Sequence, residues 1–288
     1  MHEEAKPFVK WAGGKRQLLD ELTKGLPYIE SYHEPFLGGG ALFFRLESEN
    51  RIKKAYLCDS NRELINAYSV IRTQVFELMA ELASPKYANN PMAYYKIRAS
   101  NPTSKVESAA RFIYLNKTAF NGLYRVNSKG GFNVPFGKYE NPRILDSENL
   151  LRVHRALQKD DLYCGDFTVV LKNARRGDLI YFDPPYHPIS KTSNFTGYTQ
   201  NSFYEKDQER LMRTYRALDS RGCHVILSNS YSDFISDLYA EFEPEVVYAS
   251  RAINCKGDKR GKVRELIVRN WEPEVAQRKL VKEIVASY

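Results

Sequence analysis

A short segment rich in proline offers the clearest chemistry in the chain. Asp183, Pro184, Pro185 and Tyr186 directly follow the apolar run Leu179–Phe182, which we expect to be a strand. Two prolines fix the backbone and remove donors, so the Asp183 carboxylate and the Pro184 carbonyl can both accept hydrogen bonds from one amino group. Tyr186 adds a ring face for stacking a base. The segment predicts activation of a planar aromatic amine for attack on an electrophilic methyl group; the alternative is a loop aspartate that caps a helix.

A glycine-rich turn offers a second candidate site. Phe36, Gly38 and Gly40 lie where a predicted strand passes into a predicted helix, within residues 32–46. Glycines there let a ligand approach the backbone and the helix N-terminus. Asp59 ends the next predicted strand, and its carboxylate can accept hydrogen bonds from ribose hydroxyls or, with Ser60 as an alternative, cap the following helix. Because no third glycine suits a pyrophosphate, the spacing favours a nucleoside without phosphates.

Apolar periodicity and turn residues outline the elements that must position these side chains. Further strands are expected at 54–58, 162–164, 179–182, 223–227, 245–250 and 264–268, and helices at 61–72, after Asp166, at 205–219 and at 233–239. This alternation predicts an α/β fold with a Rossmann-like doubly wound sheet.

A long insertion interrupts the predicted sheet between about residues 68 and 157. Its first part is expected to be helical, with breaks at Pro91 and Pro102. The segments 121–126 and 132–136 flank a turn rich in Asn and Gly, which is typical of a β-hairpin. A basic hairpin is therefore expected to project from a mainly helical insert.

Charge and composition limit the class of partner. The 288 residues carry a net charge of +8, and basic residues gather in Lys117–Tyr139 and Lys256–Arg264, a distribution that favours a polyanion. No apolar run approaches the roughly 20 residues that span a bilayer, and the charged N-terminal segment is unlike a signal peptide. We therefore expect a soluble, cytoplasmic protein without a membrane partner.

Cysteine and histidine usage gives no indication of a metal site. The four cysteines, Cys58, Cys164, Cys223 and Cys255, form no Cys-x-x-Cys pair, and the five histidines are scattered. Three of the cysteines lie in apolar stretches expected to be strands. Buried free thiols and no bound metal are the predictions.

Four motifs, taken in order, resemble one known family. Phe8–Lys15, Glu34–Gly40, Phe120–Arg125 and Asp183–Tyr186 resemble the Dam family of DNA adenine-N6 methyltransferases, of the α group of amino-methyltransferases. The match runs from about Phe8 to Trp271. It implies transfer of a methyl group from S-adenosylmethionine to N6 of an adenine flipped out of double-stranded DNA. It also implies GATC as the target, as in the best-known members.

The resemblance also implies roles for individual residues. The implied catalytic group is Asp183 with the Pro184 carbonyl on the target N6, and Tyr186 on the flipped base. The residues implied to bind the cofactor are Trp11, Lys15, Phe36, Gly38, Gly40, Asp59 on the ribose, Asp166 and Phe167 near the adenine ring, and Asp183. For Trp11, simple core packing is the alternative.

The hairpin region resembles the family's recognition segment. Arg125 is implied to contact guanine O6 and N7, with a phosphate contact as the alternative. The DNA-binding residues implied are Lys10 at the outer guanine, Phe120, Asn121 and Leu123 at the gap left by the flipped base, Pro135 at a thymine methyl, Lys138 at phosphate, and Asn133 and Tyr139.

The predicted domains follow from this order of motifs. Residues 1–67 and 158–271 are expected to form the catalytic domain that binds S-adenosylmethionine, residues 68–157 the target-recognition domain, and residues 272–288 an unassigned tail, in a monomer. Other DNA sites, cytosine N4 or RNA stay open as substrates, whereas a metal-dependent nuclease and a non-catalytic DNA-binding protein are less favoured. The sequence leaves open whether the enzyme belongs to a restriction-modification pair or acts alone, for example in DNA replication.

Overall fold

The computed structural model describes residues 4–11, 13–15, 17–188, 203–250 and 262–272. Within them, seven strands form one sheet in the order β3-β2-β1-β4-β5-β7-β6. Their bounds are β1 Ser31–Glu34, β2 Lys54–Asp59, β3 Asp161–Cys164, β4 Leu179–Phe182, β5 His224–Ser230, β6 Glu245–Ser250 and β7 Lys262–Arg269. Strands β1 to β5 pair in parallel, and β7 runs antiparallel to both β5 and β6. The predicted α/β sheet is confirmed.

Helices follow the strands in the predicted order. They are α1 Leu19–Thr23, α2 Ala41–Ser48, α3 Arg62–Thr73, α4 Val75–Leu82, α5 Pro91–Ala99, α6 Lys105–Thr118, α7 Ser147–Ala156, α8 Val170–Asn173, α9 Glu205–Ser220 and α10 Asp233–Leu238. Short 3₁₀ turns span Pro85–Tyr87, Phe120–Gly122, Phe167–Val169 and Ala240–Phe242. Pro91 begins α5, where its missing N–H costs nothing, and Asn90 caps that helix through Ala93 N. None of the helices in the described ranges is long and apolar enough to cross a membrane.

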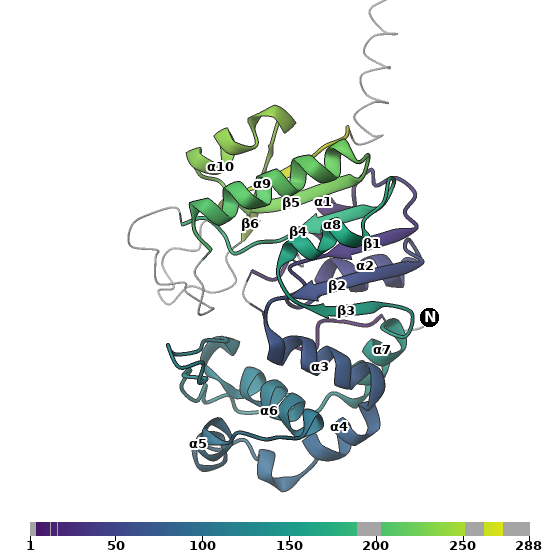
Figure 1. The fold of residues 1–288 in the computed structure, drawn as a ribbon. Coiled ribbons are helices and arrows are strands. Elements are labelled where there is room, and N and C mark those ends of the chain that lie inside the picture. The colour runs from purple at the N-terminus through teal and green to yellow at the C-terminus, as the bar shows by residue number, and fades with distance from the viewer. Residues whose placement is uncertain (1–3, 12, 16, 189–202, 251–261, 273–288) are drawn as a thin grey trace, which may run out of the picture.

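The central strand β4 shows how the sheet is covered on both faces. All four of its residues are buried. Because successive side chains of a strand point to opposite faces, Leu179 and Tyr181 join the apolar cluster that contains α2, whereas Ile180 and Phe182 join the cluster of α8 and α9. A parallel strand buried on both faces needs such a continuous apolar run. The chain after β4 therefore leaves a strand that is buried on both faces and lies between β1 and β5 (Figure 1).

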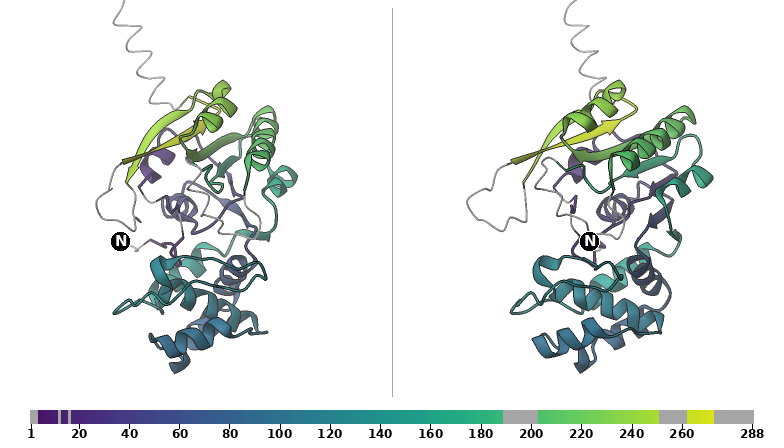
Figure 2. Two further views of the ribbon diagram at one scale, coloured as in Figure 1. Left: turned by 90° about the vertical axis from the view of Figure 1, so that its left-hand side faces the viewer. Right: turned by 60° about the vertical axis from the view of Figure 1, so that its left-hand side comes forward.

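A helical layer extends beyond the β3 edge of the sheet. Helices α4 to α7 lie together at that end of the molecule (Figure 1), and the two further views in Figure 2 show this helical layer beyond the sheet. Helix α3 is the junction, because it packs against β2 and β3 as well as α6 and α7. The predicted boundary after residue 67 falls inside this continuous helix.

Two local predictions are wrong. The cap of α3 is Asn61, whose Oδ1 accepts from Leu64 N at 3.1 Å, and neither Asp59 nor Ser60 takes that place. Cys58 and Cys223 are buried free thiols as expected, but Cys164 is exposed because it ends the edge strand β3. Cys255, residues 256–261 of the second basic segment, and residues 273–288 of the tail lie outside the described residues.

Candidate active site

The candidate site is formed by the two turns that follow the neighbouring strands β1 and β4. These strands are neighbours, and the order β3-β2-β1-β4-β5 shows that the chain proceeds outward from them in opposite directions. Such a switch point opens a crevice at the carboxyl ends of the strands, where ligands bind in open α/β sheets. The turn after β1 contains the glycines, and the turn after β4 contains Asp183. The fold thus brings together two motifs that are far apart in the sequence.

Asp183 is held by two side chains on the same oxygen. Lys15 Nζ lies 2.8 Å from Asp183 Oδ1, and Ser228 Oγ donates to Oδ1 at 3.0 Å. Ser228 is positioned in turn by Tyr181 Oη at 2.9 Å. Burial raises the pKa of Asp183, while the Lys15 ammonium and the Ser228 hydroxyl oppose that shift. One carboxylate oxygen of Asp183, Oδ1, is therefore already engaged by residues that are distant in the sequence.

Tyr186 lies beside this ion pair. Lys15 Nζ is 4.4 Å from the centre of the Tyr186 ring, and Tyr186 Oη donates to Glu265 Oε2 on β7. The Pro185 carbonyl accepts from Gln208 Nε2 at 3.1 Å, which ties the segment to α9. Pro184 is buried. A carboxylate, an ammonium and an aromatic ring thus converge at the end of β4.

The glycine turn is joined to Asp59 through the backbone. Gly38 has φ +48°, and its N–H donates to Asp59 Oδ2 at 2.9 Å. Asp59 Oδ1 accepts from Asn61 N at 2.8 Å. Burial raises the pKa of Asp59, and the hydrogen bonds from Asn61 and Gly38 oppose it. The Trp11 ring covers Gly38 so closely that a Cβ there would lie 2.6 Å from Trp11 Cδ1.

An aromatic wall continues from the same turn. Phe36 stacks on Phe167 with ring centres 5.3 Å apart, and Phe203 packs edge-on against both. Asp166 caps the 3₁₀ turn through Thr168 N and forms an ion pair with Arg210 at 2.8 Å. Gly40 precedes α2 with φ +66°. All the predicted cofactor residues therefore lie along the ends of β1, β2, β3 and β4 or, like Trp11 and Lys15, contact those ends.

The predicted hairpin is present but is not built from regular strands. Two isolated antiparallel bridges, Ala119↔Phe136 and Val126↔Phe132, replace the expected strands. Asn127 Oδ1 accepts from the backbone N–H groups of Lys129 and Gly131 and so closes the turn. The short turn at residues 120–122, where Asn121 has φ +55°, interrupts the pairing on one side.

The residues predicted to bind DNA differ in exposure. Exposed are Lys10, Phe120, Arg125, Pro135 and Lys138, whereas Asn121, Leu123, Asn133 and Tyr139 are half-buried. Leu123 packs against the main apolar cluster. Lys10 Nζ lies 4.0 Å from the centre of the Tyr139 ring.

A buried asparagine joins the N-terminal segment to this region. Asn116 Oδ1 accepts from Lys10 N at 2.7 Å, and Asn116 Nδ2 donates to Lys10 O at 2.7 Å and to Gly122 O at 3.2 Å. Next to this junction, Trp11 stacks on Tyr124 with ring centres 5.7 Å apart. Tyr124 Oη donates to Glu63 Oε2 at 2.6 Å. The glycine turn, α3 and the hairpin region are thus in continuous contact.

Comparison with known proteins identifies the family. The model for D12 class N6 adenine-specific DNA methyltransferases matches residues 11–253, which is most of the chain. The chain belongs to this family. It is an adenine-specific DNA methyltransferase, as predicted from the four motifs.

Relatives of this methyltransferase cover it almost completely. The type II methyltransferase M.MjaIII of Methanocaldococcus jannaschii is 44% identical over 288 residues, covering 93% of this chain and 100% of the relative. The type II methyltransferase M1.LlaDCHI of Lactococcus lactis subsp. cremoris is 43% identical, covering 92% and 95%. The DNA adenine methylase of Escherichia coli K12 is 35% identical over 267 residues, covering 91% and 94%.

Several residues at the methyltransferase site were missed by sequence reasoning. Ser228 could have been predicted from the sequence, because it directly follows the apolar part of β5. Phe182 of β4 pairs with Leu227 of β5, and this register sets Ser228 beside Asp183. Glu265 had none, since β7 enters the sheet antiparallel from the end of the chain. Phe203 and Arg210 belong to the segment at the start of α9, whose side chains no strand pattern could place.

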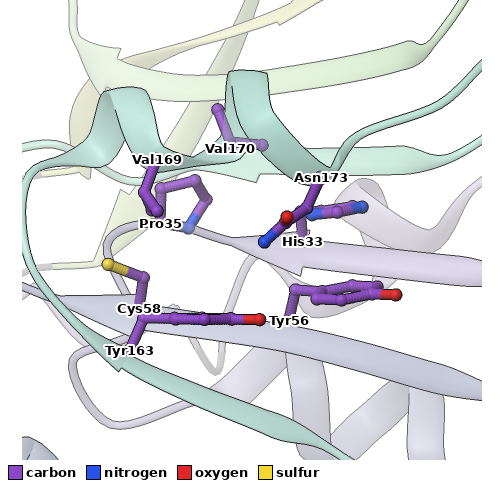
Figure 3. Close-up of a pocket in the computed structure, with 8 residues that line it drawn as sticks. All are labelled: His33, Pro35, Tyr56, Cys58, Tyr163, Val169, Val170 and Asn173. Carbon is purple, nitrogen blue, oxygen red and sulfur yellow. The ribbon is translucent and has the colours of Figure 1, made fainter.

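A small pocket is lined by several sequence neighbours of the predicted cofactor residues, such as Pro35 beside Phe36 and Cys58 beside Asp59. It is lined by His33, Pro35, Tyr56, Cys58, Tyr163, Val169, Val170 and Asn173. Figure 3 shows these side chains between the strands β1 to β3 and the helical segment above them. None of them was predicted as a site residue, and His33 is already engaged by Asp178 at 3.0 Å. In the described parts of the chain, no group of three or more His, Cys, Asp or Glu could hold a metal ion.

Proposed function

We propose that this methyltransferase transfers a methyl group from S-adenosylmethionine to N6 of an adenine flipped out of double-stranded DNA, within the sequence GATC. The family supports adenine methylation in DNA. The observation that supports the finer proposal is the convergence of Asp183, Tyr186 and the Gly38–Asp59 turn at the switch point between β1 and β4.

The residues at the glycine turn fit an adenosyl group. When bound, S-adenosylmethionine supplies an electrophilic methyl group carried on a sulfonium. Each carboxylate oxygen of Asp59 accepts one backbone N–H and keeps acceptor capacity for a ribose hydroxyl. Phe36 and Phe167 offer an apolar wall for a purine ring.

The segment Asp183–Tyr186 fits the amine that accepts the methyl group. Asp183 and the Pro184 carbonyl would accept the two N6 hydrogens and favour a tetrahedral nitrogen whose lone pair is available for attack. Tyr186 would stack on the base, with its ring held in place by Glu265. The base must leave the duplex, because N6 of a stacked adenine cannot reach a crevice in the protein. Lys15 stays on Oδ1 and favours the ionised form of Asp183.

The helical layer and the hairpin support the DNA-binding part of the proposal. We assign residues 68–157 to target recognition and residues 1–67 and 158–271 to catalysis, with α3 as a shared element. Arg125, exposed on the hairpin, would form a bidentate contact with guanine O6 and N7. Trp11 and Lys10, adjacent in sequence, would face the cofactor turn and the DNA respectively.

The test is protection of plasmid DNA. DNA from a host without adenine methylation is incubated with the protein and S-adenosylmethionine and then digested with a GATC-cutting enzyme that adenine methylation blocks. We expect protection with the wild-type protein and none with Asp183→Ala. If cutting continues while tritiated methyl enters the DNA, the GATC assignment is wrong; if no label enters the DNA but label enters RNA in a parallel incubation, the DNA substrate is wrong.

A binding experiment tests Arg125. Arg125→Ala should weaken binding to GATC duplex by about 1 to 3 kcal/mol and should leave binding to random duplex nearly unchanged. Lys129→Ala is the matched control, because it removes a positive charge from the same hairpin at an exposed position. An equal loss on both duplexes for Arg125→Ala would assign this residue to phosphate.

A further inference from the structure

A hydrogen bond across the hairpin fixes the Arg125 side chain. Arg125 Nε donates to Asn133 Oδ1 at 2.8 Å, and the Asn133 backbone N–H donates to the Arg125 carbonyl at 3.0 Å. The two residues therefore face each other both through the backbone and through their side chains. The Val126↔Phe132 bridge closes the hairpin immediately beyond them.

Asn133 lies in a more buried segment of the hairpin than Arg125. Its neighbours Phe132 and Val134 are 8% and 1% exposed. The Val134 carbonyl accepts from Tyr94 Oη at 2.8 Å and from Arg98 Nη1 at 3.1 Å, which ties this side of the hairpin to α5. Arg125 is exposed and has a long side chain with many rotamers. The asparagine can thus act as the anchor of the pair.

The contact also selects which edge of the guanidinium is available. Arg has five N–H donors in a plane, and the Nε–H is already used by Asn133. The N–H groups of the two terminal Nη atoms are not used in this hydrogen bond. An end-on fork of this kind can match two acceptors on one base edge.

We propose that Asn133 is a positioning residue that orients Arg125 for guanine, and that it acts on specificity through Arg125 rather than through a contact of its own with DNA. This proposal rests on the proposed role of Arg125 in reading a base. Loss of Asn133 would leave Arg125 to be ordered at the moment of binding, which costs about 2- to 12-fold in affinity for one long side chain.

The experiment is a double-mutant cycle on DNA binding. Dissociation constants are measured at one salt concentration for wild type, Asn133→Ala, Arg125→Ala and the double variant, each with GATC duplex and with a duplex carrying 7-deazaguanine in place of the target guanine. 7-Deazaguanine removes the N7 acceptor that the fork requires. The thermal unfolding midpoint of every variant is recorded, so that loss of folding is seen separately.

We expect Asn133→Ala to weaken GATC binding by about 2- to 12-fold and to reduce discrimination against 7-deazaguanine. In the Arg125→Ala background, Asn133→Ala should have no further effect. If the two losses multiply instead, Asn133 makes its own contact, for example to phosphate, and the proposal is wrong. If Arg125→Ala itself leaves discrimination unchanged, the proposed base contact of Arg125 fails instead.

Asn133→Asp provides a conservative variant. Its carboxylate still accepts from Arg125 Nε, while its negative charge is unfavourable near DNA phosphates. We expect weaker binding to both duplexes with the discrimination ratio retained. Loss of discrimination in Asn133→Asp as large as that in Asn133→Ala would contradict orientation through this hydrogen bond.

Discussion

Replacing Gly38 with alanine perturbs the contact between the glycine turn and Trp11. Gly38 has φ +48°, where an L side chain costs about 1 to 2 kcal/mol. The new Cβ would lie 2.6 Å from Trp11 Cδ1, so the indole must retreat and weaken its stack on Tyr124, worth about 0.5 to 1.5 kcal/mol. Alanine regains about 0.4 to 1 kcal/mol by restricting the unfolded chain. We expect a net loss of about 0.5 to 3 kcal/mol in the free energy of unfolding.

Two other glycines separate the causes of this loss. Gly177 also has positive φ, +85°, but nothing lies within 4 Å of a Cβ there, so Gly177→Ala measures the backbone cost alone. Gly39→Ala has only ordinary contacts, the nearest at 3.5 Å, and no positive φ, so it should change stability little. Both controls lie on the same chain and carry the same chemical change.

The assay is urea unfolding with linear extrapolation, followed by tryptophan fluorescence in a Trp271→Phe background so that Trp11 alone is seen. Gly38→Ala should be less stable than Gly177→Ala by about 0.5 to 1.5 kcal/mol and should shift the Trp11 emission, with the urea slope unchanged. Equal losses in Gly38→Ala and Gly177→Ala, with unchanged emission, would refute the steric reasoning.

Two further predictions concern buried carboxyl groups. Burial raises the pKa of Asp183 above its usual 3.8, and the ionised form is the acceptor for N6, so kcat/KM should fall with acid along a limb above that value. Lys15→Gln removes an opposing charge and should move this limb to higher pH; a limb that stays in place would contradict the role of Lys15. Burial raises the pKa of Asp160 from 3.8 to about 6 in the folded protein. The contribution of this group to the free energy of unfolding is therefore most favourable below pH 3.8 and is lost as the pH rises to about 6. Asp160→Asn should therefore stabilise the protein by about 1 to 3 kcal/mol at pH 7 and by almost nothing near pH 4, as measured by urea unfolding; an equal effect at both pH values would contradict this.

Local patterns were sufficient for the elements and for the principal groups of the site. The apolar run before Asp183 predicted β4, and the predicted strand at 54–58 placed Asp59 at the end of β2. The glycine turn was predicted correctly because glycines between an apolar strand and a helix are typical of such a turn. These features depend on neighbours in the sequence.

The missed features depend on side chains that meet across the fold. The contact of Lys15 with Asp183 joins residues from opposite parts of the chain, and Glu265 reaches Tyr186 only because β7 inserts beside β5. The choice of Asn61 over Asp59 as the cap of α3 follows from the engagement of Asp59 by Gly38, which no local pattern contains. The hairpin lacks regular strands because Asn121 turns the chain with positive φ.

The contacts of Asn116 have a consequence for protein engineering. Its side chain clasps the backbone of Lys10 on one side and of Gly122 on the other, and a Cβ on Gly122 would lie 2.5 Å from Lys10 Cδ. A hairpin transferred from a relative with a different target would therefore have to fit against the N-terminal segment of this chain, to which its own residues are not matched. Exchange of residues 119–137 alone would disturb this contact. A graft that also includes residues 8–11 and 116 would keep the hairpin and the N-terminal segment matched to each other.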